Sequence, residues 1–366
     1  MPAIFLNVSE IASFVGQNKW STSDAFSRLW KKYDKEYDMC LIELNNQISK
    51  KNVDLIVISN EKRILEENLE KGLLTKRQFS KSIKENDIKK LKIEKNIIEI
   101  KEQVEHISLT QVEKIEKELG NTITNTISSE STNTNEKRKI TNQAIDVLEK
   151  TGKINDKQKQ ELIKQTTSLI NTTHGTLKED LAIEMFEKQY NITLDTTQKY
   201  YKYLLFNSDR YNWYIGGKMD GLYIDFENSE NNYVVEVKNR IKGFFTSLRE
   251  YELTQIQLYL LLTGHNKAKL VEKYNKKIRV TDIARQEEYI NDTLEYLKIF
   301  INNFTRFLSN FNLKMQYISL NEHDKNLFLG NLYLKEIMKL RSKKAELLII
   351  ESQTQQDCLL DDLDDF

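Results

Sequence analysis

The sequence has only two cysteines, Cys40 and Cys358, and they stand far apart. Two distant cysteines cannot form a disulfide framework, and they are too few for a four-cysteine iron–sulfur cluster. Residues 1–6 lack a basic region, and no apolar run approaches roughly 18 residues, so we expect neither a signal peptide nor a membrane span. These absences predict a soluble intracellular protein.

The sequence also lacks a net charge, because 55 basic residues balance 55 acidic ones. A neutral protein that binds DNA must segregate its charges. Residues 265–279 do so with one acid, Glu272, against six basic residues, which are Lys267, Lys269, Lys273, Lys276, Lys277 and Arg279. Arg240 and Lys242 follow Lys238 in a second basic cluster. Such side chains would hold phosphates without reading base sequence, although a plain solvated face remains the alternative.

The length of 366 residues exceeds what one compact core needs, which predicts two domains or one domain with a large insertion. We expect the insertion at residues 39–165, where the composition differs, and isoleucine and valine recur at alternating steps of four and three (Ile93, Ile97, Ile100, Val104 and Ile107). This short coiled-coil stripe favours an internal helical hairpin over a dimer seam, because only two heptads hold. The polar residues 121–135 predict a flexible linker.

Residues 217–238 predict a β-hairpin. Tyr223 and its neighbours lead out of a first strand, a polar turn follows, and Tyr233–Lys238 is rich in β-branched residues. Because strand side chains alternate between faces, Glu236 and Lys238 lie over one patch with Val234. Asp220 stands sixteen residues before Glu236 and can return beside it across the hairpin.

Two carboxylates beside a lysine predict a site for a hard divalent cation. Mg²⁺ takes oxygen ligands, commonly one or two carboxylates together with substrate phosphate oxygens. Lys238 could then orient a water molecule or offset charge that develops on the phosphate. A charged, solvated sheet edge explains the same three residues, and from the hairpin alone both interpretations stay open.

Two helices flank this hairpin in the sequence. Ser247 and Glu250 form a capping box that opens a helix ending at Gly264, and Gln255 and Tyr259 share one face of it. Upstream, Gly175–Glu179 opens another helix, whose Thr176-x-x-Glu179 pattern also fits a capping box. Farther on, residues 268–273 and 278–283 predict a second hairpin, and a helix with Leu294, Leu297, Ile301 and Phe304 follows it. This order predicts a mixed sheet flanked by helices.

The motifs from Gly175 to Tyr259 together resemble the PD-(D/E)XK nuclease superfamily, in the branch of lambda exonuclease and the YqaJ-like viral recombinases. The matching residues are Gly175–Glu179, Asp220, Glu236-Val237-Lys238 and Gln255–Tyr259. Residues 9–20 are similar to the Ser-x-x-Ala-x-x-x-Gly-x-Asn motif near the N-terminus of that branch. The superfamily's proline is replaced by Met219, and no arginine precedes Ser9 to meet a DNA 5′ phosphate.

The resemblance implies a restriction-endonuclease-like mixed central sheet with a large, partly coiled-coil helical insertion. Residues 1–38 and 166–350 would form the nuclease domain. Asp220, Glu236 and the Val237 carbonyl would hold Mg²⁺, for which Mn²⁺ would substitute, and Glu179 would contribute to the same or a second metal. Lys238 would act on the water nucleophile.

For the remaining site residues, the resemblance implies contacts to DNA or ordering of the site. Gln255 and Tyr259 would do so from the adjoining helix, although Tyr259 could instead only pack that helix against the sheet. The other predicted contacts are Ser9, Lys19, Arg240 and Lys242. The aromatic residues between Tyr200 and Tyr214 could stack on unpaired bases, or could serve the core.

The resulting hypothesis is a Mg²⁺-dependent DNA exonuclease that acts on double-stranded ends in recombination or repair. A structure-specific or restriction-like endonuclease and a catalytically silent DNA-binding scaffold are the alternatives. By resemblance the protein would work in the cytoplasm, the nucleus or a viral replication site, as a homotrimer around DNA. The acidic residues 351–366 predict either a disordered end or a docking peptide for a single-strand-binding or annealing protein.

Overall fold

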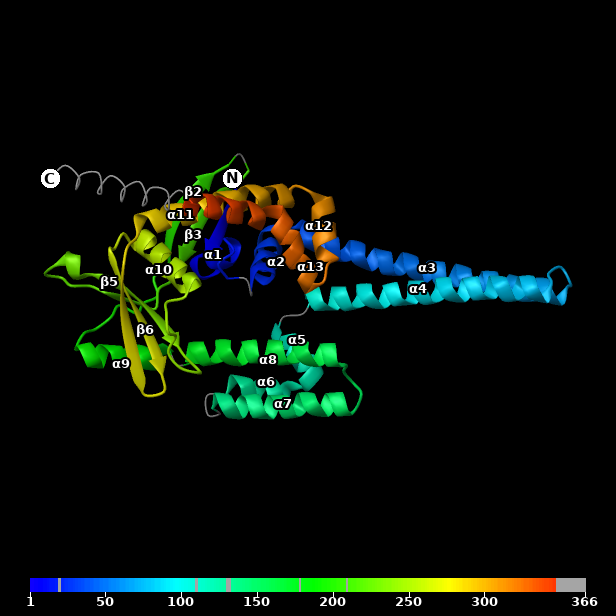
Figure 1. Ribbon diagram of the computed structural model, residues 1–366, viewed down its shortest axis with the longest axis horizontal. Coiled ribbons are helices and arrows are strands. Elements are labelled where there is room, and N and C mark those ends of the chain that lie inside the picture. Colours follow the sequence, from blue (N-terminus) through cyan, green and yellow to red (C-terminus); the bar gives the residue numbers. More distant parts are fainter. Residues whose placement is uncertain (19–20, 109–110, 130–132, 178, 209, 347–366) are drawn as a thin grey trace, which may run out of the picture.

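The computed structural model describes residues 1–346 except 19–20, 109–110, 130–132, 178 and 209. Two small sheets and the helices around them form a body, from which two long paired helices project as an arm (Figure 1). The strands are β1 Ala3–Asn7, β2 Tyr201–Asn207, β3 Asn212–Gly217, β4 Gly221–Tyr223, β5 Tyr233–Asn239, β6 Lys267–Tyr274 and β7 Lys277–Ala284. The predicted acidic tail lies outside the described residues.

The α-helices occur in three groups along the chain. The first group is α1 Val8–Phe14 and α2 Thr22–Tyr33. The second is α3 Glu36–Glu70, α4 Lys76–Ser108, α5 Gln111–Leu119, α6 Asn121–Ser128, α7 Thr134–Lys150, α8 Asp156–Leu177 and α9 Glu179–Tyr190. The third is α10 Glu250–Thr263, α11 Glu287–Leu308, α12 Phe311–Ile318 and α13 Glu322–Leu329, followed by a π-helical turn and further helical residues to 346.

The mixed α/β character predicted from the sequence is confirmed, but the single central sheet is wrong. One sheet has the order β1-β3-β2 and the other the order β4-β5-β6-β7. Both are mixed, since β1 runs parallel to β3 and β5 runs parallel to β6, while the other pairs are antiparallel. The chain leaves the first sheet at Gly217 and enters the second at Gly221, and this short turn separates the two sheets.

The two predicted hairpins are confirmed. β4 pairs with β5 so that Gly221 lies opposite Val235, and β6 pairs with β7 along its whole length. The predicted alternation along β5 also holds. Val235 and Val237 pack on α9, whereas Val234 belongs to the larger core on the other face.

The larger core is built mainly from aromatic rings of α2 and α11. Phe26 meets Phe304 and Phe307 edge to face at centroid distances of 5.0 Å, and Trp213 of β3 packs on Phe304. The predicted apolar stripe of Leu294, Leu297, Ile301 and Phe304 lies on α11 as expected. This core fixes β1 and β3 against the helices, and thereby fixes the turn that leads to Asp220.

The helices between α2 and α9 pack mainly on one another and make few contacts with the two sheets. α3 and α4 run side by side as a helical hairpin, which is the pairing within the chain that the stripe predicted (Figure 1). Residues 121–128 correct the prediction of a flexible linker, because they form helix α6. Ile127 of this polar segment is fully buried against α7 and α8, which explains why the segment folds.

Two predicted helix starts are wrong. Gly175 lies within α8, which continues to Leu177, and the next helix begins only at Glu179. Helix α10 begins at Glu250 with Arg249 as N-cap, and no side chain caps it, so Ser247 does not open it. Its predicted end is confirmed, because Gly264 has φ of 73°, a left-handed conformation that glycine adopts without strain. In the described part of the chain, no helix is both long and apolar enough to cross a membrane.

Candidate functional site

The β4–β5 hairpin brings Asp220 beside Glu236, as the sequence predicted. Asp220 stands immediately before β4, and its Oδ2 accepts a hydrogen bond of 2.7 Å from the backbone N–H of Val237. This bond ties the turn between the two sheets to the middle of β5. The position of Asp220 is therefore set by backbone geometry rather than by a flexible loop.

Glu236 is buried, with a residue exposure of 2%. Its Oε1 accepts a hydrogen bond of 2.5 Å from Nζ of Lys238. Its Oε2 is also buried, but it has no hydrogen-bond partner in the described part of the chain. Leaving a buried carboxylate oxygen without a donor or cation is costly, so the arrangement fits a site that receives a further positive group.

The electrostatics of the two carboxylates agree with this interpretation. Burial raises the pKa of Glu236 to about 7, and the nearby charge of Asp220 adds to the rise. Burial likewise raises the pKa of Asp220 to about 7, with Glu179 adding to the rise and Lys238 opposing it. Two carboxylates that are both hard to ionise would be stabilised in their charged form by a cation between or beside them.

Lys238 stays protonated in this setting. Burial favours loss of its proton, but the charges of Glu236 and Asp220 outweigh burial and raise the pKa of Lys238. Its Nζ lies 2.5 Å from Glu236 Oε1 and 3.3 Å from Gln255 Oε1. Lys238 is therefore a hydrogen-bond donor and a fixed positive charge, not a base.

Helix α10 supplies the two residues predicted to order the site. Gln255 connects Lys238 to the hydroxyl of Tyr259, which lies 3.4 Å from Gln255 Nε2. Tyr259 is only 4% exposed, and its ring presses on Gly217, where an added Cβ would come within 2.9 Å of it. Its burial raises its pKa far above the usual range, so the phenol stays neutral. Tyr259 thus packs the helix against β3 and also ends the hydrogen-bond chain.

Glu179 is the first residue of α9, and its charge acts on Asp220. Glu184, one turn farther along, is exposed. Among the described residues, no group of three or more His, Cys, Asp or Glu side chains could together hold a metal ion. A cation here would consequently depend on Asp220 and Glu236 with backbone, water or substrate oxygens, which is a donor set that Mg²⁺ accepts.

The prediction that Arg240 contacts DNA is not supported by its position. Its guanidinium is buried, with Nη1 2.7 Å from Glu252 Oε1 and Nε 2.7 Å from Glu272 Oε1. The Phe245 ring covers it at 4.0 Å. Arg279 forms the other ion pair of Glu272, so part of the predicted basic stretch 265–279 is also neutralised internally. We therefore correct Arg240 from a DNA ligand to a structural residue.

The remaining predicted contacts are scattered. Ser9 is exposed on α1, and none of the described hydrogen bonds joins it to the carboxylates. Lys19 lies outside the described residues. Lys242 is exposed just beyond Arg240 and remains free to meet a phosphate. Gln17, in the same N-terminal motif, docks on α10 through Thr254 Oγ1 at a distance of 2.6 Å from its Oε1.

Glu252 is a site-supporting residue that the sequence analysis missed. It is 1% exposed, binds Arg240 through both carboxylate oxygens, and adds negative potential at Glu236 and Lys238. Its position could have been predicted from the sequence, because residues 252, 255 and 259 fall on one face of a helix.

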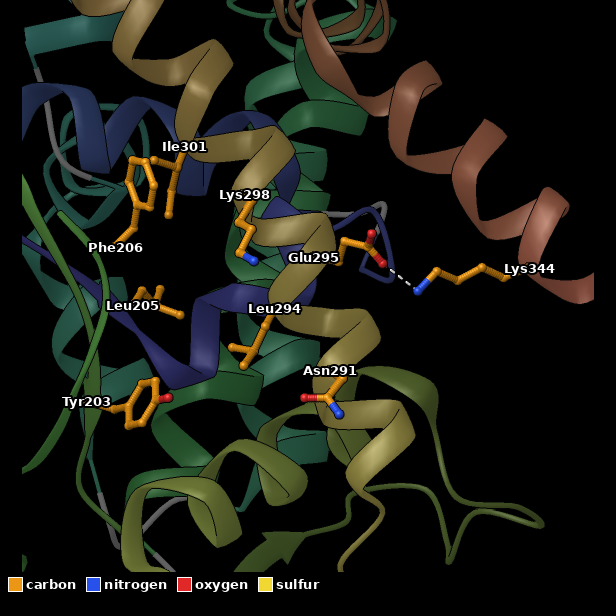
Figure 2. A pocket seen from close by; sticks show the side chains of 9 residues that line it. All are labelled: Tyr203, Leu205, Phe206, Asn291, Leu294, Glu295, Lys298, Ile301 and Lys344. Carbon is orange, nitrogen blue, oxygen red and sulfur yellow. Dashed lines mark ion pairs between the residues drawn. The ribbon is translucent and has the colours of Figure 1, made fainter. Parts of the chain in front are cut away.

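One cavity of the described structure lies away from these residues. It has a volume of about 380 Å³ and lies between β2 and α11 (Figure 2). Tyr203, Leu205 and Phe206 line one side and Leu294 and Ile301 the other, with a Glu295–Lys344 ion pair at its rim. None of the predicted catalytic residues lines it.

Comparison with known proteins gave matches only among solved structures. No family model matches the chain, and no curated protein matches it. The alkaline exonuclease LHK-Exo of Laribacter hongkongensis is 14% identical, with a TM-score of 0.31 over 57% of this chain and 99% of that one. A phage-related exonuclease of Haemophilus somnus is 14% identical, with a TM-score of 0.29 over 38% of this chain and 72% of that one.

A third structure, that of SSO0001, is 17% identical, with a TM-score of 0.29 over 40% of this chain and 66% of that one. Two of these three solved structures are exonucleases by name. At these TM-scores the likeness carries no conclusion about activity, which is inferred below from the side chains of the site.

Proposed function

We propose that this chain is a metal-dependent deoxyribonuclease, and more narrowly a Mg²⁺-dependent exonuclease that degrades DNA from double-stranded ends. The observation that carries the proposal is the pair of buried carboxylates, Asp220 and Glu236, beside a protonated Lys238, with Glu236 Oε2 unpartnered among the described residues. A structural ion pair would satisfy both oxygens of its carboxylate. In this pair, one carboxylate oxygen remains available to a further ligand.

Asp220 and Glu236 would hold the Mg²⁺, with the Val237 carbonyl as an additional oxygen ligand and Glu179 at the edge of the site. When bound, the metal supplies Lewis acidity toward a phosphate oxygen and lowers the pKa of a water molecule. The hydrogen bond from the Val237 N–H would hold Asp220 in place for the metal.

Lys238 would position the attacking water and stabilise negative charge that develops on the phosphate, because its ammonium is fixed and protonated. Gln255 holds Lys238 by a hydrogen bond of 3.3 Å, and Tyr259 holds Gln255. The chain from Tyr259 to Lys238 therefore orients the ammonium. Shortening Gln255 is expected to reduce the rate of cleavage without removing it.

The test of the proposed function is digestion of linear and closed circular duplex DNA in Mg²⁺, with label at either the 5′ or the 3′ end of the linear form. The proposal predicts loss of label from linear DNA and no nicking of the circle. Asp220→Ala and Lys238→Ala should abolish digestion while far-ultraviolet circular dichroism stays unchanged. Nicking of the circle would establish the endonuclease alternative instead, and full activity in both variants would refute the site.

A further inference from the structure

The first sheet has two unlike faces. Its inner face carries Ile4, Leu6, Trp213 and Ile215, which are each at most 1% exposed. Residues paired across neighbouring strands share a face, so Phe5, Tyr214, Leu204 and Lys202 all lie on the opposite, outer face. We call these four residues the outer face. Leu204 is 44% exposed, and the Phe5 and Tyr214 rings are only partly buried.

The aromatic run between Tyr200 and Tyr214 is thereby divided between two locations. Tyr203 and Phe206 lie toward α11, where they line the cavity between β2 and that helix (Figure 2). Tyr214 points to the outer face, and its ring stacks on Phe5 at 5.0 Å with an interplanar angle of 16°. The first group borders a cavity and is about 40% exposed, and the second forms a ring stack on the opposite face.

Cations accompany the rings of the outer face. Lys202 Nζ lies 5.8 Å from the centroid of Tyr214, on the same face of the sheet. At the end of the face stands Tyr200, which is 44% exposed and has Lys32 and Tyr33 near its hydroxyl. Lys199 covers the Tyr201 ring at 5.3 Å, but Tyr201 lies on the inner face, because it alternates with Lys202 along β2. Lys32 and Lys202 are both exposed.

Rings and exposed lysines on one open surface are the chemistry that single-stranded nucleic acid requires. Bases stack on aromatic faces, and lysines bind the phosphates between them. The segment 199–207 contains two lysines and no acid, so it complements a polyanion. A duplex would not use the rings, because its bases are already stacked and paired inside the helix.

The outer face is also continuous with the candidate catalytic site. The Tyr200 hydroxyl lies so close to Gly216 that an added Cβ there would come within 2.3 Å of it. Gly216 precedes Asp220 by four residues, a stretch of chain that spans at most about 14 Å. Lys218, between them, is exposed. A strand lying on the rings would accordingly pass close to the carboxylates.

We propose that the outer face of the β1-β3-β2 sheet, together with Tyr200 and Lys32, binds single-stranded DNA. Because it assumes that this chain acts on DNA, the inference rests on the proposed nuclease function. Tyr200 and the Phe5–Tyr214 stack receive bases, and the lysines receive phosphates. The bound strand is the one that enters or leaves the carboxylate pair, so this surface adds a binding site that the motif residues do not include.

The experiment measures fluorescence anisotropy of a labelled oligo-dT in EDTA, which prevents metal-dependent cleavage. Tyr200→Ala is expected to bind about tenfold more weakly, since loss of one base stack has roughly that effect. Tyr200→Phe keeps the ring and is expected to bind like the unsubstituted protein. The matched control is Phe226→Ala, which removes a ring that is 95% exposed on the β4–β5 turn.

The lysines are tested by the double variant Lys32→Glu with Lys202→Glu. Both are exposed, so the fold should persist, and the salt dependence of binding should fall by about 1.4 in log–log slope for two lost phosphate contacts. Lys71→Glu, at the far tip of the α3–α4 arm, is the charge control (Figure 1). Unchanged affinity in Tyr200→Ala and in the double variant would overturn the inference, as would equal losses for a duplex of the same length.

The outcome separates this inference from the proposed function. If the unsubstituted protein digests DNA but the variants bind oligo-dT normally, only the inference fails. If the variants lose oligo-dT binding but the unsubstituted protein digests no DNA in Mg²⁺, the binding surface stands and the nuclease proposal fails.

Discussion

Two charged clusters lie next to each other around the end of β5, and they differ in the ratio of positive to negative side chains. In the structural cluster, two arginines face two carboxylates: Arg240 binds Glu252 and Glu272, and Arg279 binds Glu272. In the second, unbalanced cluster, Asp220 and Glu236 face a single lysine, Lys238. The first cluster has as many positive as negative groups, whereas the second has an excess of negative ones.

The pKa values report the same contrast. Burial alone would raise the pKa of Glu272, but hydrogen bonds from Arg279 and Arg240 outweigh burial and lower it. Burial raises the pKa of Glu236 to about 7, and no second cation among the described residues opposes it. Glu272 and Glu236 lie in the same sheet, but Glu272 is held in its charged form, whereas Glu236 lacks a second positive partner. The unbalanced cluster is the one that fits a metal ion.

The largest expected effect on stability comes from breaking the balanced cluster. Arg240→Ala leaves Glu252 and Glu272 buried with too little positive charge, and removal of one partner from a buried ion pair typically costs about 3–5 kcal/mol. Urea denaturation followed by circular dichroism measures the free energy of unfolding.

The matched control for this prediction is Lys242→Ala, two residues farther on. Lys242 is exposed, so its removal is expected to change the free energy of unfolding by less than about 0.5 kcal/mol. Equal effects of the two substitutions would show that the Arg240 network does not hold this region together.

An intermediate effect is expected from neutralising the unbalanced cluster. The pKa of Glu236 in the folded state, about 7, lies above its usual 4.5, so folding favours the protonated form. The stability that this preference contributes is present below pH 4.5 and is lost as the pH rises through 7. Without metal, Glu236→Gln should therefore gain stability relative to the unsubstituted protein between pH 5 and pH 8, by on the order of 3 kcal/mol.

The corresponding measurement is the free energy of unfolding at several pH values in EDTA. Glu227→Gln, on the exposed β4–β5 turn, is the control and should follow the unsubstituted protein at every pH. A Glu236→Gln variant that is less stable at pH 8 than at pH 5, relative to that control, would contradict the inferred protonation of the pair.

The smallest effect is the stabilisation by Mg²⁺. A ligand that binds only the folded state at a hundred times its dissociation constant adds about 2.7 kcal/mol. Thermal unfolding should shift upward with Mg²⁺ at pH 8 for the unsubstituted protein, and less at pH 6, because protons compete for the same oxygens. Glu236→Gln should show no shift. An equal shift in both proteins would place the metal elsewhere.

The sequence predicted the local parts of the site well. Alternation along β5 put Glu236 and Lys238 on one face, and the hairpin returned Asp220 beside them, because both relations depend only on strand geometry. The helical spacing of Gln255 and Tyr259 was sufficient for the same reason. These residues lie within or next to single elements, whose side-chain directions follow from the backbone period.

What the sequence did not predict depends on contacts between distant elements. From the sequence, Arg240 was predicted to contact DNA. Its partners Glu252 and Glu272 could not be inferred, because they are twelve and thirty-two residues away and on other elements. The helix α6 was missed because its composition is polar, and only its burial against α7 and α8 shows why it forms. Likewise, Gly175 was placed at a helix start, although α8 runs through it.

The most direct test of the central claim compares the rate of Mg²⁺-dependent digestion of end-labelled linear duplex DNA by Glu236→Gln and by Glu227→Gln. If the unbalanced cluster is the catalytic centre, Glu236→Gln should digest the duplex about 1,000-fold more slowly than the unsubstituted protein, while Glu227→Gln keeps the full rate. Equal digestion by both variants would contradict the claim that Asp220, Glu236 and Lys238 carry the reaction.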